Sequence, residues 1–145
     1  MRRLLHILVS ATIVVCLTGY AQAASAEQIT VRIRSIAAST QGNSVDGELE
    51  DLESKLNKSF GDYTSFDLVD DESFEVDKGG SGSVTVPGGT EVTVKFKGLS
   101  EDLLRLGLTV GDKLRTSLRA SPGSTFFQAG LSYKDGMLIL AITAE

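Results

Sequence analysis

The chain has 145 residues, of which 19 are acidic and 14 basic, and its formal net charge is −5. This length suffices for one domain with its own hydrophobic core. The acidic balance argues against nucleic acid and against anionic membrane surfaces as partners, because both usually require a basic protein surface.

The first 23 residues match the three parts of a secretory signal peptide. Residues 1–3 carry two arginines, residues 4–19 form an uncharged apolar run, and residues 21–23 are a small-residue cleavage motif. We predict cleavage after Ala23, or after Ala26, where the small-residue pattern recurs. The apolar run is shorter than the roughly 20 residues of a membrane-spanning helix, so we expect no stable membrane insertion after cleavage.

Cleavage removes two kinds of chemistry, because Cys16 and His6 both lie in the signal. Residues 24–145 keep all 19 acidic residues and 12 of the basic ones, which gives a formal net charge of −7. Without histidine and cysteine this segment has no Ser-His-Asp triad, no thiol nucleophile and no usual zinc ligands. We therefore predict no catalytic residue, no cofactor and no enzymatic activity. Lipidation of Cys16 is an alternative that the bulky Val15 before it disfavours.

The first predicted elements are a strand and a helix. Apolar and polar residues alternate over residues 29–34, which predicts a half-buried strand. The period then changes, and a helix is predicted from about Gly47 to Lys58, with Asp46 as its N-terminal cap. The apolar residues at helical spacing are Leu49, Leu52, Leu56 and Phe60.

From Tyr63 onward the hydrophobic period is two almost everywhere, with turn signals about every 8 to 12 residues. The final run, residues 137–144, is apolar on both faces, which predicts a central strand covered on both sides. The predicted fold is mainly β (α+β). It is a single domain over residues 24–145, an antiparallel β-sandwich or curled sheet with one short helix after the first strand.

An acidic stretch, DLVDDESFEVD, contains the weak calcium candidates Asp70, Asp71 and Glu72. Calcium takes six to eight oxygen ligands, and exported proteins often use it. The spacing departs from the known calcium loop, so a solvated acidic hairpin of two strands is the favoured interpretation. A calcium-dependent surface adhesin module stays an alternative.

Paired carboxylates are the one catalytic possibility that the sequence leaves open. Asp70 or Asp71, together with Glu91 or Glu101, could serve glycoside hydrolysis, which needs one protonated and one ionised carboxyl group. A carboxylate-based hydrolase acting on polysaccharide is therefore the second alternative.

Basic residues occupy the outward positions of several predicted strands. If those strands are neighbours, one sheet face is a basic stripe that can dock an acidic partner; if not, these side chains cover apolar sheet and protect strand edges. The candidates for partner binding are Arg32, Arg34, Lys95 and Lys97, and Arg105, Arg115 and Arg119 extend the stripe.

Phe126 and Phe127 are adjacent in a predicted strand, so one ring points away from the main core. We expect that ring to meet the helix or a second sheet. The alternative is an exposed apolar anchor for a partner, so both residues are partner-binding candidates.

Three segments carry a resemblance to known proteins: VDGELEDLESKLNKSFGDYTSFDLVD, VTVPGGTEVTVKF and GMLILAITA. Their layout resembles small exported β-rich proteins of Gram-negative bacteria that have no established activity. The resemblance implies a periplasmic or extracellular location and a β-rich domain, and it transfers no functional residue. The expected function is thus that of an exported, non-catalytic envelope or secreted protein. We expect it to bind another protein of the envelope in an assembly or accessory role.

Overall fold

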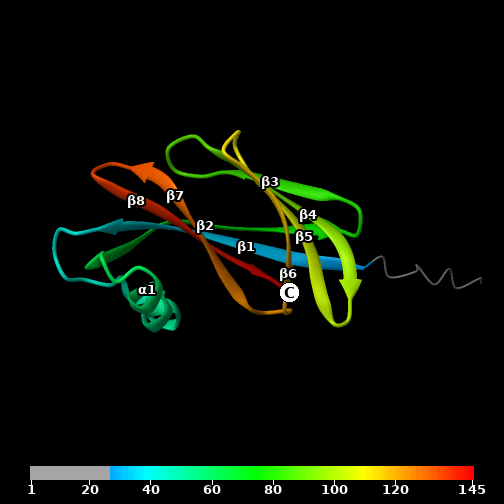
Figure 1. Cartoon of the computed structure of the whole chain (residues 1–145), viewed down its shortest axis with the longest axis horizontal. Coiled ribbons are helices and arrows are strands. Elements are labelled where there is room, and N and C mark those ends of the chain that lie inside the picture. The colour runs from blue at the N-terminus through cyan, green and yellow to red at the C-terminus, as the bar shows by residue number, and fades with distance from the viewer. Residues whose placement is uncertain (1–26) are drawn as a thin grey trace, which may run out of the picture.

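Two β-sheets face each other, and a short helical segment covers the other side of one of them (Figure 1). The computed structural model describes residues 27–145, so the predicted signal peptide lies outside the described residues. The elements in chain order are β1 (Gln28–Ser39), the 3₁₀ helix η1 (Gly47–Leu52), α1 (Glu53–Ser59), β2 (Ser65–Asp77), β3 (Ser81–Thr85), β4 (Glu91–Ser100), β5 (Leu103–Val110), β6 (Leu114–Ala120), β7 (Thr125–Tyr133) and β8 (Gly136–Ala144).

Each sheet has four antiparallel strands. Sheet A has the strand order β2-β1-β8-β7, and sheet B has the order β3-β4-β5-β6. The chain passes from sheet A to sheet B between β2 and β3, and it returns between β6 and β7. The predicted mainly β fold, with one short helical segment after the first strand, is confirmed.

The main hydrophobic core lies between the two sheets. Alternate side chains of each strand point into it, as the period of two predicts. On β8, Leu140 and Ile142 face this core, whereas Ile139 and Ala141 face a second core on the opposite side of sheet A. The prediction that the last strand is central and covered on both faces is confirmed.

The second core lies between sheet A and the helical segment. Leu49, Leu52 and Leu56 are buried there against Phe66 and neighbouring residues of sheet A. Asp46 caps the segment as predicted, because its Oδ1 accepts a hydrogen bond from the Glu48 amide at 3.1 Å.

The helical segment differs from the prediction in one respect, because its first six residues are 3₁₀ rather than α. The Leu49 amide donates to the Asp46 carbonyl three residues earlier, which is the tighter 3₁₀ pattern common at helix N-termini. No helix within residues 27–145 combines the length and apolar character that crossing a membrane requires.

The acidic stretch forms one long strand, so the expected acidic hairpin is wrong. All thirteen residues of β2 run antiparallel to β1, and the register shifts once, at Val69. A turn in the middle would need residues such as glycine or proline, which β2 lacks. The long β1 instead offers pairing partners along the whole of β2, and the extra residue becomes a bulge.

We predict that Gly136→Ala destabilises the protein. A Cβ at position 136 would overlap the backbone carbonyl oxygen of Ala38, and backbone cannot move aside as cheaply as the end of a side chain. Overpacking of this kind costs about 1–3 kcal/mol, measurable by urea denaturation. Gly47→Ala is the matched control, because a Cβ there meets nothing within 4 Å. Equal stability of the two variants would contradict the prediction.

Candidate functional site

Five basic side chains gather on the outer face of sheet B, the face turned away from the main core. They come from three neighbouring strands, and the alternation of each strand places them on one side. We call this surface the basic face, and its cations are Lys95, Lys97, Arg105, Arg115 and Arg119.

The pairing register brings these cations together around a glycine. Lys95 lies opposite Gly107, Gly107 opposite Ser117, and Arg105 opposite Arg119. The Lys97 Nζ atom donates to the Ser117 hydroxyl at 2.8 Å. The basic face has two shallow depressions of about 370 and 330 Å³. Gly107 lines the first, where the absence of a side chain leaves room above the sheet.

The basic face has little neutralising charge of its own. Among residues 27–145 none of its five cations forms an ion pair. The alternation of the strands places one acidic side chain on the same face, Glu91 at the start of β4. Four of the five cations are exposed, and Lys97 is half-buried. The positive charge is therefore free to act on an external group.

The charge of the chain is divided between its two halves. Residues 27–77 contain thirteen acidic and four basic residues, whereas residues 78–145 contain six acidic and eight basic ones. The first half supplies β1, β2 and the helical segment, and the second half supplies the whole of sheet B together with β7 and β8. An acidic protein thus carries one positively charged surface.

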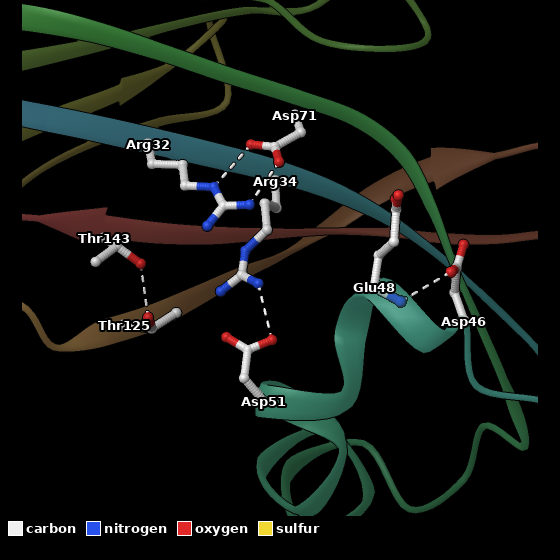
Figure 2. A network of polar contacts seen from close by, with 8 residues as sticks. All are labelled: Arg32, Arg34, Asp46, Glu48, Asp51, Asp71, Thr125 and Thr143. Carbon is white, nitrogen blue, oxygen red and sulfur yellow. Dashed lines mark hydrogen bonds and ion pairs between the residues drawn. The ribbon is translucent and has the colours of Figure 1, made fainter.

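The seven bases do not form the single stripe that the sequence left open as one alternative, because Arg32 and Arg34 lie on sheet A. Their strand, β1, pairs with β2 and β8 and not with β4. Figure 2 shows both arginines beside carboxylates. The Arg32 Nε and Nη2 atoms donate to Asp71 at 2.9 and 2.6 Å, and the Arg34 Nη1 atom donates to Asp51 at 3.0 Å. Lys95 and Lys97 remain together on the basic face.

The two ion pairs shift the pKa values of their members. The hydrogen bonds from Arg32 lower the pKa of Asp71, and the hydrogen bond from Arg34 lowers the pKa of Asp51. The Asp71 carboxylate in turn raises the pKa of Arg32. These carboxyl groups therefore stay ionised at neutral pH.

The structure does not bring the calcium candidates together. Asp71 lies on the face of β2 opposite to Asp70 and Glu72, and it is engaged by Arg32. Within residues 27–145 no group of three or more acidic side chains is arranged to hold a metal ion.

Phe126 and Phe127 both pack against the interior, one on each side of β7. Phe126 contacts the core between the sheets, and Phe127 contacts the second core. The rings of Phe127 and Phe60 meet edge to face, with their centroids 5.7 Å apart. The packing of Phe127 in the second core confirms the expectation that the outer ring meets the helical segment. Both residues are half-buried, so neither is a fully exposed anchor.

Two residues of the basic face, Gly107 and Ser117, were not among the binding candidates predicted from the sequence, although alternation places Ser117 on the same side as Arg115 and Arg119. Neither belongs to a motif. The register places Gly107 between Lys95 and Ser117, and Ser117 accepts a hydrogen bond from Lys97. Comparison of the chain with protein-family models, curated proteins and solved structures finds no match. The function of the chain must therefore be inferred from the geometry and chemistry of its surface.

Proposed function

We propose that the chain is an exported, non-catalytic binding protein that docks an acidic segment of another protein on its basic face. The observation that carries the proposal is the gathering of five cations on the outer face of sheet B, with no ion pair among residues 27–145. Opposite charges across an interface steer association and suppress wrong partners.

An acidic protein segment suits this face better than a nucleic acid or an anionic membrane does. The whole chain has a formal net charge of −5, so an extended polyanion meets repulsion from the rest of the molecule. A short acidic segment can lie along three strands without approaching the acidic β2. The serine, threonine and glycine residues between the cations offer hydrogen bonds and room for a polypeptide.

Binding, rather than catalysis, is supported by the residues available. The only histidine and cysteine are His6 and Cys16, inside the proposed signal peptide. The pKa values of Asp51 and Asp71 are lowered, whereas a carboxyl group that acts as a general acid needs a raised pKa. Export is supported by the sequence of residues 1–23, and the proposed partner is an envelope protein.

Retention on immobilised poly-L-glutamate tests the docking chemistry. We expect the protein to bind at low ionic strength despite its net negative charge, and to elute as salt rises, since charges are screened over about 10 Å at 0.1 M. The variant Lys95→Gln/Lys97→Gln/Arg115→Gln is expected to lose this retention.

The matched control removes three lysines from elsewhere on the surface. Lys55, Lys58 and Lys134 are exposed and lie outside the basic face, so the variant Lys55→Gln/Lys58→Gln/Lys134→Gln has the same net charge as the first. We expect it to keep the retention of the parent protein. Equal loss in both variants would assign retention to net charge and would reject the basic face as a docking surface.

A further inference from the structure

The basic face ends at a strand whose outer edge is free. β6 is the last strand of sheet B, and within residues 27–145 it pairs with β5 alone. An edge strand carries backbone N–H and C=O groups that have no partner in its own sheet, so a further strand can be added to it. The seven residues of β6 include no glycine or proline, and their pairing with β5 has no register shift. β6 therefore offers a regular edge.

Two backbone hydrogen bonds near the turn between β5 and β6 show which groups of β6 are free. The Gly111 amide donates to the Glu91 carbonyl of β4 at 2.8 Å, and the Lys113 amide donates to the Val110 carbonyl at 3.0 Å. Val110 therefore turns its carbonyl toward β6, where the register places it opposite Leu114. Because backbone groups alternate in direction along an antiparallel strand, Leu114 and every second residue after it bond to β5.

The residues between them carry both the free backbone groups and the positive charge. The N–H and C=O groups of Arg115, Ser117 and Arg119 point to the free edge, and within residues 27–145 no further strand pairs with them. The side chains of these three residues lie on the basic face. A strand added at this edge would place its own side chains beside those of Arg115 and Arg119, with Cβ atoms about 5 Å apart.

The opposite side of an added strand would meet the border of the main core. Leu114 and Leu118 are half-buried there and pack against the core, whereas Thr116 between them is exposed. The main core is thus open to solvent beside β6. Apolar side chains of an added strand would cover this border and leave water themselves. The two sides of the edge together fit a strand in which acidic and apolar residues alternate.

The charges of β6 disfavour a second copy of the chain as the added strand. Antiparallel pairing of two β6 strands centred on Ser117 would place Arg115 of each copy opposite Arg119 of the other. Like charges directly opposite each other on one sheet face destabilise the pairing. The same arginines attract a strand with acidic residues at these positions.

The other three edge strands are less suited to an acidic strand. β2 contains a bulge and six acidic residues, and the pairing of β7 shifts register within residues 128–131. Bulges and charges at an edge discourage the addition of strands. β3 has five residues, one of which is a glycine. β6 is the edge that joins a regular backbone to positive charge.

We propose that the acidic segment of the partner binds as an added antiparallel strand along β6. The inference rests on the proposed docking at the basic face, and it defines the sequence of the segment. Opposite residues 115–119 the segment carries acidic residues at both ends and apolar residues at the second and fourth positions. Its acidic residues exchange backbone hydrogen bonds with the outward groups of β6, and their carboxylates meet Arg115 and Arg119.

Two N-methylated peptides test the addition of a strand. The parent peptide is acetyl-Thr-Glu-Val-Glu-Val-Glu-Thr-amide, and we expect it to shift the backbone amide signals of Arg115, Ser117 and Arg119 in a saturable way by NMR. N-methylation of the central glutamate removes the N–H group that faces Ser117, and it is expected to weaken binding at least about fivefold. N-methylation of the following valine is the matched control, because that N–H group points away from β6. The control peptide is expected to bind as the parent peptide does.

A rearranged peptide tests the alternation. Acetyl-Thr-Val-Val-Glu-Glu-Glu-Thr-amide has the same composition and charge as the parent peptide, but it cannot place all its glutamates on one side of a strand. We expect it to bind at least about threefold more weakly, because several cross-strand pairs are lost. Equal binding of the rearranged and parent peptides would overturn the proposed sequence of the segment.

Retention on poly-L-glutamate separates the failure of this inference from the failure of the proposed function. Strand addition is overturned if a retained protein binds the two methylated peptides equally, or if it shows no saturable shift with the parent peptide. Docking by charge then stands without strand pairing. A protein that is not retained on poly-L-glutamate overturns the proposed function and, with it, strand addition.

Discussion

Leu140→Ala is expected to lower the free energy of unfolding by about 2–5 kcal/mol. Leu140 is fully buried in the central strand β8 and packs in the core between the two sheets. Neighbouring strands hold its surroundings, so the cavity left by the smaller side chain cannot collapse easily. Urea denaturation followed by fluorescence or circular dichroism measures the loss.

Leu99→Ala is the matched control for Leu140→Ala. The two residues share a side chain, but Leu99 is 51% exposed. Its truncation is expected to change stability by no more than about 0.5 kcal/mol. A small effect at Leu140, or equal effects at both positions, would contradict the sandwich arrangement in which β8 is covered on both faces.

The second large effect is an asymmetry within one ion pair. Asp51→Ala should cost on the order of 1–3 kcal/mol, whereas Arg34→Met should stay within about 1 kcal/mol of the parent protein. The side chain of Arg34 is 4% exposed and that of Asp51 is 61% exposed. Removal of Asp51 leaves a buried cation without its partner, whereas removal of Arg34 leaves a carboxylate that water can solvate.

The pH dependence of the free energy of unfolding distinguishes loss of this ion pair from loss of helix packing, because only the ion pair depends on the ionisation of Asp51. Arg34 lowers the pKa of Asp51 below its ordinary value of 3.8. The stabilisation is therefore present above pH 3.8 and is lost as the pH falls through the lowered pKa. We expect the stability gap between the parent protein and Asp51→Ala to narrow under acid conditions.

Glu50→Ala controls for the change of a carboxylate in the same 3₁₀ helix. Glu50 is exposed, and it forms no ion pair within the described part of the chain. The Glu50→Ala variant is expected to have the same free energy of unfolding as the parent protein at neutral pH and under acid conditions. A larger cost for Arg34→Met than for Asp51→Ala would contradict the assigned roles of this pair.

The spacing of apolar residues predicted the strands and the helical segment themselves, because it shows which face of each element is buried. The run at residues 137–144 predicted a central strand, and Leu49, Leu52 and Leu56 predicted a helix with one buried face. These two predictions agree with the structure because the spacing of apolar residues depends directly on whether one face or both faces of an element are buried.

The bulge in β2 could not be predicted, because it depends on the partner strand. The stretch around Val69 contains apolar and polar residues that fit either a turn or a long strand. Only the pairing with β1 decides between them, and the register shift at this point then sets which acidic side chains share a face.

The separation of the basic residues also depends on topology. Arg32 and Lys95 occupy equivalent outward positions in their own strands, yet the two strands belong to different sheets. Arg34 lies two residues from Arg32 on the same face of β1, but the helical segment covers only Arg34. Both the basic face and the burial of Arg34 therefore become visible only in the folded chain.

Site-specific photocrosslinking in the native host tests the central claim most directly. A photoreactive residue at Thr109, on the basic face, should crosslink to an acidic segment of one dominant envelope protein, which mass spectrometry would identify. The same group at Lys55, on the helical segment, should give no such product. Crosslinking of the same protein from Lys55 but not from Thr109, or no crosslink from Thr109, would contradict docking on the basic face.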